Sequence, residues 1–224
     1  HVVCRRQRQM CIRDSSNAII ESSNTFFFSL AYRSEIDELV NHLYNFGFGK
    51  NVCIDCFLPD KGLLPTPQWK MNTHNFGWYK GDTVNIGVGQ GYLSATPIQL
   101  AYYSAFLANK GKLNDLSFIQ DKENRAKSVF LSNQINDIDW EKIHESMIGV
   151  IESPNGTAGR LKNLKDYIIA AKSGTVELVS TDTKEDYKII REIEGQRDHA
   201  IIIAFGPMPN PCLLYTSPSP RDGL

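Results

Sequence analysis

The stretch YIIAAKSGTVEL, residues 167–178, combines an apolar run with a lysine, two hydroxyls and a glycine. Its apolar part is short, continuous and bounded by polar residues, which is the pattern of a buried strand. A second run, HAIIIAFGP at residues 199–207, has the pattern of a strand covered on both faces. The charged segment between them has no helix pattern strong enough for a crossover, so we expect the two strands to pair antiparallel. Lys172 then places a positive charge at the end of a buried strand. Burying a charge costs free energy, so we expect the site to use this one.

The overall composition is that of a globular protein with balanced charge. The 224 residues include 24 Lys and Arg against 25 Asp and Glu, which gives a net charge of -1. This balance argues against a nucleic-acid partner and against intrinsic disorder. No apolar run reaches the length of a bilayer-spanning helix, and no signal peptide pattern is present. We expect one globular domain that uses no cofactor.

Both ends of the chain look foreign to this domain. QMCIRDS, residues 9–15, back-translates to a DNA whose reverse complement encodes CLLYTS, the sequence of residues 212–217. Two ends encoded by opposite strands of one DNA element, together with the final SPSPRDGL, resemble a translated sequencing adapter. We therefore assign residues 1–15 and 212–224 to adapter-like sequence and residues 16–211 to the domain. The alternative is a genuine basic N-terminal arm.

Helical periodicity appears in three segments. Residues 35–44 carry apolar side chains on one face at helical spacing. Further along, Thr96 is a good N-cap, Pro97 suits the first helical position, and Gln99 completes a capping box. Residues 140–151 predict another helix, which an SPNG turn ends. The intervening segment from 50 to 80 is rich in Pro, Gly, Asn and aromatic residues without a period, which indicates a long excursion packed by its aromatic side chains.

Two further patterns raise alternatives with weaker support. The glycines at positions 87, 89 and 91 suggest a dinucleotide-binding turn, but no convincing strand precedes them and no acidic ribose partner follows. Cys53 and Cys56 form a C-x-x-C pair without a second pair or a thioredoxin-like context. Two small loop residues are therefore favoured over a metal or redox site.

The candidate binding and catalytic residues fall into two short motifs. Lys172, Ser173, Gly174 and Thr175 supply a cation, two hydroxyls and a glycine that lets a ligand approach the backbone, a set suited to a carboxylate. The alternative is a lysine that extends into solvent from a strand edge. The second motif is an S-x-N triplet, Ser22 and Asn24, between an apolar run and an aromatic one. Its alternative explanation is helix capping.

Together these motifs resemble the transpeptidase domain of class B penicillin-binding proteins, most closely the elongation type. The resemblance covers residues 17–211, and its most specific part is GDTVNIGVGQGYLSATPIQLA, which lies between the S-x-N and K-S-G motifs. GLLPTPQW, SPNGTAG and RDHAIIIAFGP support it in the same order. It implies an α/β (α+β) fold of the serine β-lactamase and transpeptidase type, with an antiparallel sheet flanked by helices and a helical subdomain. The active site would lie between the sheet and that subdomain.

The resemblance also implies roles for the individual residues. Ser22 would relay a proton between the reacting serine and an amine, and Asn24 would bind a substrate amide. Lys172, with the hydroxyls of Ser173 and Thr175, would hold the carboxylate of a D-Ala-D-Ala stem peptide or of a β-lactam antibiotic. Gly174 would leave room for substrate, and the N–H of Thr175 would form half of an oxyanion hole.

The sequence departs from the family at the nucleophile. No serine in the 224 residues is followed three positions later by lysine, so the S-x-x-K motif is missing. We therefore expect a fragment, truncated at both ends and inactive alone, of a peptidoglycan D,D-transpeptidase. The resemblance implies a protein anchored in the inner membrane that faces the periplasm, with cell-wall elongation proteins as partners. The alternatives are a serine β-lactamase or D,D-carboxypeptidase, and a non-catalytic β-lactam-sensing domain of the same fold.

Overall fold

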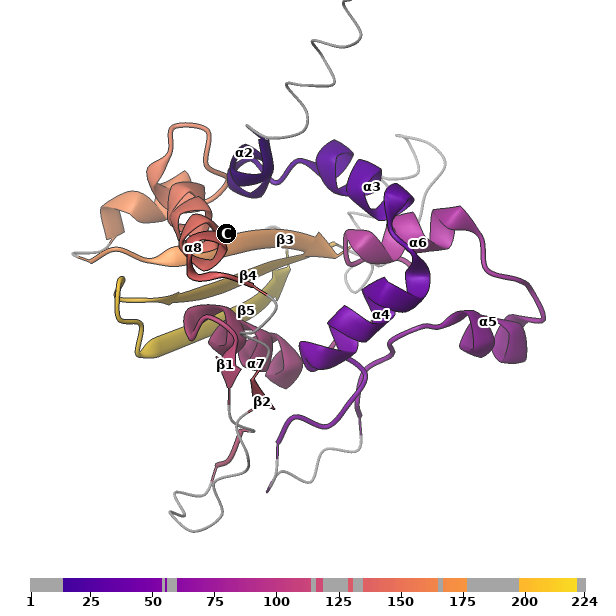
Figure 1. Ribbon diagram of the computed structural model, residues 1–224. Coiled ribbons are helices and arrows are strands. Elements are labelled where there is room, and N and C mark those ends of the chain that lie inside the picture. Colours follow the sequence, from indigo (N-terminus) through magenta and orange to yellow (C-terminus); the bar gives the residue numbers. More distant parts are fainter. Residues whose placement is uncertain are drawn as a thin grey trace, which may run out of the picture.

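A three-stranded antiparallel sheet carries the K-S-G motif on its edge strand (Figure 1). The computed structural model describes residues 14–53, 55, 60–113, 116–118, 129–130, 135–164, 167–176 and 198–220. The strands are β3 (Ala170–Val176), β4 (His199–Gly206) and β5 (Leu213–Pro220), in the order β3-β4-β5. The predicted antiparallel pairing of the first two strands is confirmed, with Lys172 opposite Ile203.

Strand β5 consists of residues that the sequence assigns to adapter. It pairs with β4 along its whole length, from Leu213 opposite Gly206 to Pro220 opposite His199. Prolines donate no N–H and are tolerated on an edge strand, which is the position β5 occupies. That this segment is foreign to the domain stays a prediction, because main-chain pairing places few demands on side-chain identity.

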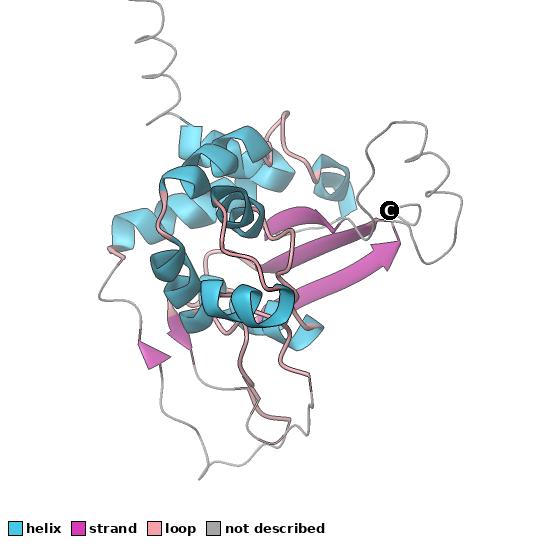
Figure 2. Cartoon of the chain, turned by 90° about the vertical axis from the view of Figure 1, so that its right-hand side faces the viewer, coloured by secondary structure: helices cyan, strands magenta, loops and turns pink. Residues whose placement is uncertain are grey.

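Helices α7 (Pro97–Ala108) and α8 (Asp137–Glu152) pack against the sheet. Helix α8 contacts β3, and α7 contacts β4 and β5. The contact buries Tyr102, Trp140 and Phe205 almost completely in one apolar cluster. Figure 2 shows most of the helices gathered on one side of the strands. Burial of these large side chains supplies the main driving force that holds the two helices on the sheet.

The start of α7 follows its sequence signal closely. Thr96 accepts a hydrogen bond from the backbone N–H of Gln99, and the Gln99 side chain accepts one from the backbone N–H of Thr96. The predicted capping box is thus confirmed. Helix α8 begins three residues earlier than expected because Asn136 caps it, accepting from the N–H of Asp139 at 2.8 Å.

The remaining α-helices of the described residues form a helical layer beside the sheet. Its helices are α2 (Asp14–Ile20), α3 (Asn24–Arg33), α4 (Ile36–Asn45), α5 (Pro67–His74) and α6 (Lys80–Gly87). Smaller elements are β1 (Lys112–Leu113), β2 (Val129–Phe130) and the 3-10 helix η2 (Gly159–Leu164). Helix α4 confirms the amphipathic helix predicted at 35–44. Helices α3 and α6 lie side by side, and a side chain at Gly87 would collide with Ala31.

The excursion predicted at 50–80 contains a helix, α5, that the sequence analysis missed. Its N-cap, Thr66, accepts from the N–H of Trp69 at 3.1 Å, and a proline follows, so α5 shares the Thr-Pro start of α7 but lacks its capping box. The expected aromatic packing is only partly right: Trp69 and Trp78 are half-buried, whereas Phe76 is 62% exposed.

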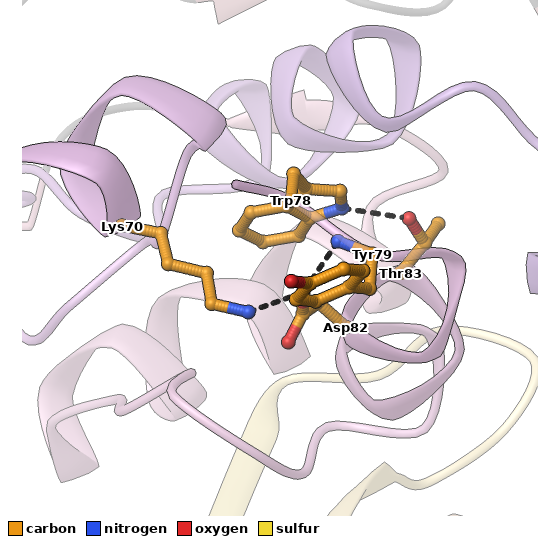
Figure 3. A network of polar contacts seen from close by, with 5 residues as sticks. All are labelled: Lys70, Trp78, Tyr79, Asp82 and Thr83. Carbon is orange, nitrogen blue, oxygen red and sulfur yellow. Dashed lines mark hydrogen bonds and ion pairs between the residues drawn. The ribbon is translucent and has the colours of Figure 1, made fainter. Parts of the chain in front are cut away.

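A buried ion pair joins α5 to the start of α6 (Figure 3). Lys70, only 5% exposed, contacts the carboxylate of Asp82 at 2.6 Å. The same carboxylate accepts from the N–H of Tyr79 at 2.7 Å, and the ammonium lies 4.8 Å from the Tyr79 ring centroid. Trp78 donates to the hydroxyl of Thr83 at 2.9 Å. The network fixes α6, and the loop that follows this helix closes one end of a cleft beside β3.

Candidate active site

A cleft of about 750 Å³ separates β3 from the helical layer. Residues 172–176 of β3 line one wall. Ser22 and Asn24, with aromatic side chains of α3, line the opposite wall, and the segment that follows α6 closes one end. All six residues singled out from the sequence as site candidates therefore face one cavity.

Ser22 lies in the turn between α2 and α3 with a φ of 54°. This left-handed conformation is unfavourable for serine and persists only where the surroundings enforce it. The N-cap of α3 is Ser23, which makes no side-chain capping bond, so capping does not explain Ser22. Its Oγ instead accepts a hydrogen bond from Nζ of Lys172 at 2.7 Å, across 150 positions of sequence. Asn24, the first residue of α3, is exposed and lines the cleft beside it.

Lys172 turns inward and does not extend into solvent. Its Nζ also donates to the carbonyl oxygen of Ser173 at 2.6 Å. Burial lowers the pKa of its ammonium to about 8. No carboxylate forms an ion pair with it among the residues that the structure describes. A partly desolvated cation held only by neutral oxygens is a receptor for an anion, because a carboxylate would restore the stabilisation that burial removes.

Ser173 has a hydroxyl partner that the sequence analysis did not identify. Its Oγ lies 2.6 Å from Oγ1 of Thr157, which follows the SPNG turn after α8. A side chain at Gly156 would collide with the carbonyl oxygens of Gly149 and Val150, so the turn requires glycine there. The backbone N–H of Thr157 also donates to the carbonyl of Ile20 at 3.3 Å, close to Ser22.

The far end of the cleft is formed by Gly174 and Thr175. A Cβ at Gly174 would meet only a backbone oxygen at 3.9 Å, so the strand surface is open to a ligand there. The carbonyl of Thr175 accepts a hydrogen bond from Nε2 of Gln90 at 2.8 Å. Gln90 lies in the loop after α6, between the glycines weighed above as a dinucleotide turn. A helix precedes these glycines where that motif needs a strand, so the dinucleotide alternative is wrong.

Tyr103 of α7 is the second titratable residue that lines the cleft. Burial raises the pKa of its phenol, so it stays neutral over the physiological range. Lys172 is therefore the one lining group, among the described residues, that changes charge near pH 8.

The cysteine pair differs from the expectation of two small loop residues. Cys53 is disulfide-bonded, while Cys56 lies outside the described residues. Within the described ranges no three His, Cys, Asp or Glu side chains gather as a metal site would require. The helices in those ranges include none long and apolar enough to cross a bilayer.

Comparison with known proteins assigns the chain to a family. Residues 5–214 match the penicillin binding protein transpeptidase domain. The chain is 37% identical over 207 residues to the peptidoglycan D,D-transpeptidase MrdA of Salmonella typhimurium, an alignment of 88% of this chain and 33% of that protein. MrdA of Acinetobacter baumannii is 36% identical over 202 residues, covering 87% and 30% of the two chains. The chain thus spans about a third of the length of these curated relatives.

Solved structures give the same result at the level of the fold. The Pseudomonas aeruginosa PBP2 complex with WCK 5153 superposes with a TM-score of 0.74 at 32% identity, covering 92% of this chain and 44% of that one. PBP2 of Helicobacter pylori, in complex with MreC, gives a TM-score of 0.75 at 27% identity over 90% and 35% of the two chains. The family match, the relatives above 30% identity and these superpositions lead to one conclusion: the chain belongs to the penicillin-binding protein transpeptidase family.

Proposed function

We propose that this chain forms part of the active site of a peptidoglycan D,D-transpeptidase, whose nucleophilic serine comes from an S-x-x-K segment outside these 224 residues. The observation that carries the proposal is the 2.7 Å contact between Lys172 Nζ and Ser22 Oγ. It joins two motifs far apart in sequence in a cleft of the size that a peptide end requires. The MrdA relatives are named as enzymes of this activity.

The proposed reaction is an acyl transfer in two steps. The oxygen of the absent serine bonds to the carbonyl carbon of the penultimate D-Ala, the C–N bond breaks, and the terminal D-Ala leaves with a proton. An amine of a neighbouring stem peptide then attacks the ester carbonyl, and the serine oxygen recovers its proton. Ser22 relays the proton in both steps, and its contact with a cation favours transient negative charge on its oxygen. Asn24 orients the substrate amide.

Strand β3 provides recognition of the substrate. The ammonium of Lys172 and the hydroxyls of Ser173 and Thr175 bind the terminal carboxylate of the peptide, or the carboxylate of a β-lactam. The open surface at Gly174 admits the substrate backbone. The N–H of Thr175 stabilises the oxyanion together with a donor from the missing segment.

The wider setting of the protein follows from its relatives. We propose that helices cover both faces of the sheet in the whole protein and that a membrane anchor holds it on the periplasmic side. A disulfide at Cys53 fits an oxidising compartment of this kind. A Helicobacter pylori PBP2 has been solved with MreC, so we propose a partner of the MreC type from the cell-wall elongation complex.

The test is covalent labelling by a fluorescent penicillin. The complete reading frame of the source gene is expressed and compared with the 224-residue chain. We expect the complete protein to carry an S-x-x-K motif and a stable acyl adduct, and this chain to remain unlabelled. Rapid hydrolysis of the adduct would instead indicate a β-lactamase. Removal of the terminal D-Ala from stem peptides without cross-linking would indicate a carboxypeptidase. A stable adduct without turnover of any stem peptide would indicate a sensing domain, and a complete protein without the motif would refute the enzyme.

A further inference from the structure

Gln90 joins the two sides of the cleft at the end away from Ser22. Its side-chain amide, on the loop after α6, donates to the carbonyl oxygen of Thr175 on β3 at 2.8 Å. The two residues are 85 positions apart, and the bond is exposed. No role assigned above to the candidate residues uses this contact.

The contact occupies a backbone group that the sheet leaves free. Because β3 is an edge strand, every second residue of it points its N–H and C=O away from β4. The carbonyls of Ser173 and Thr175 both accept side-chain donors, from Lys172 and Gln90, so these two residues are the outward-facing ones. An extended peptide that adds to this edge needs the same carbonyls for its own N–H groups.

The backbone of the loop that carries Gln90 is held by contacts that do not involve the Gln90 side chain. Gly89 and Gly91 have φ values of 76° and 75°, which favour glycine. The N–H of Gln90 donates to the carbonyl of Asn85 at 2.9 Å, which fixes the loop to the end of α6. Breaking the contact with Thr175 therefore needs only rotation of the Gln90 side chain, with no change in the loop.

We propose that Gln90 is a specificity-determining residue that competes with the ligand for the Thr175 carbonyl and so weakens the preference for ligands that offer an N–H there. The inference rests on the proposed function, since it assumes a ligand that lies along β3. In the free protein Gln90 satisfies this carbonyl. A ligand with an amide N–H at this position must displace the glutamine donor and gains no additional hydrogen bond, whereas a ligand without one leaves the Gln90 contact intact.

The proposal predicts how removal of the donor changes ligand preference. In a Gln90→Met variant the carbonyl is covered only by water, so a ligand N–H no longer competes with a protein donor. We expect acylation by an acylamino β-lactam such as benzylpenicillin to become faster by about 2- to 10-fold, the range of one exposed hydrogen bond. Acylation by a carbapenem, which has no acylamino group, should stay constant or fall. The preference for benzylpenicillin over the carbapenem therefore rises.

The experiment measures second-order acylation rates for both antibiotics on the complete protein. Gln90→Ala is the second variant, which guards against misfolding of the first, and thermal midpoints are recorded for each. Gln68→Met is the matched control, because the amide of Gln68 also donates one exposed hydrogen bond, to Asn72 on the same helix, away from the cleft. The preference of this control variant for benzylpenicillin over the carbapenem should equal that of the wild-type protein.

The possible outcomes separate the inference from the proposed function. A raised preference in both Gln90 variants supports the inference. Parallel loss of both rates, an unchanged preference, or slower acylation by benzylpenicillin alone overturns it while the transpeptidase assignment stands. Failure of the wild-type protein to react with either antibiotic overturns the proposed function, and the inference with it.

Discussion

The charge on Lys172 determines whether the proposed site can hold a carboxylate, so its titration is a direct test. Burial lowers the pKa of this lysine to about 8, against a usual value of 10.5. Roughly nine tenths of the side chains are then charged at pH 7 and a tenth at pH 9. If the cation binds the ligand carboxylate, acylation of the complete protein by penicillin should slow by about tenfold between these pH values. A lysine with an ordinary pKa would keep its charge throughout this range.

The comparison variant is Lys172→Arg, whose guanidinium keeps its charge at every pH used. We expect its acylation, although slower because the geometry changes, to be independent of pH from 7 to 9.5. The other titratable residue that lines the described part of the cleft, Tyr103, is neutral over this range because burial raises its pKa. A flat wild-type profile, or an equal fall in the arginine variant, would show that Lys172 is not the titrating group.

The same pKa shift makes a prediction about stability that can be measured on the 224-residue chain. Because the folded-state pKa lies below the unfolded one, the folded chain binds fewer protons between about pH 8 and pH 10.5. Lys172 therefore destabilises the fold below pH 8, and the penalty is lost as the pH rises through this window. The shift corresponds to at most about 3 kcal/mol, reduced by the remaining exposure of the side chain. Lys172→Met should keep or raise the thermal midpoint at pH 7, while the same change in the complete protein lowers acylation.

Three further predictions concern residues around the cleft. Lys70→Met leaves the Asp82 carboxylate buried without its cation, and urea unfolding should show a loss of about 3–5 kcal/mol that the double variant with Asp82→Leu partly restores. Gln99 is 1% exposed, caps α7, and places its side-chain NH2, with two N–H donors, within hydrogen-bond distance of three loop carbonyls, so Gln99→Leu should cost about 2–4 kcal/mol by the same assay. Thr157→Val removes the partner of the Ser173 hydroxyl, and acylation should fall by about 2- to 10-fold at an unchanged thermal midpoint, with rescue by Thr157→Ser.

Local signals in the sequence were sufficient for the elements that bury apolar surface. Continuous apolar runs predicted β3 and β4, and the capping box at Thr96 and Gln99 fixed the start of α7. Helices α5 and α6 were missed because they have little apolar periodicity. An ion pair between Lys70 and Asp82 holds them together. These two residues lie 12 positions apart in a segment whose sequence pattern predicts a loop. An ion pair between two short helices leaves no repeating pattern in the sequence.

The candidate site was predicted unevenly for a related reason. Residues that belong to short motifs, such as Lys172 and Ser22, could be singled out from the sequence as candidates, and the resemblance to the family then implied their roles. Thr157 and Gln90 could not, because each becomes significant only through a partner that folding brings near. The glycines around Gln90 could be identified in the sequence, but their spacing suggested a dinucleotide-binding turn. In the structure they form the loop that positions the Gln90 side chain against β3.

Strand β3 links these observations, since three of its positions, 172, 173 and 175, contact three different parts of the chain. Lys172 contacts Ser22 from the α2–α3 turn, Ser173 contacts Thr157 from the turn after α8, and the Thr175 carbonyl contacts Gln90 from the loop after α6. In the proposed site each contact uses a polar atom that a ligand would need, so the free protein already satisfies the groups proposed to recognise substrate. Binding is then an exchange of internal partners for those of the ligand, and selectivity depends on how well each partner is replaced. The contacts of Thr157 and Gln90 are exposed, so substitutions at these two residues should alter ligand preference more than stability.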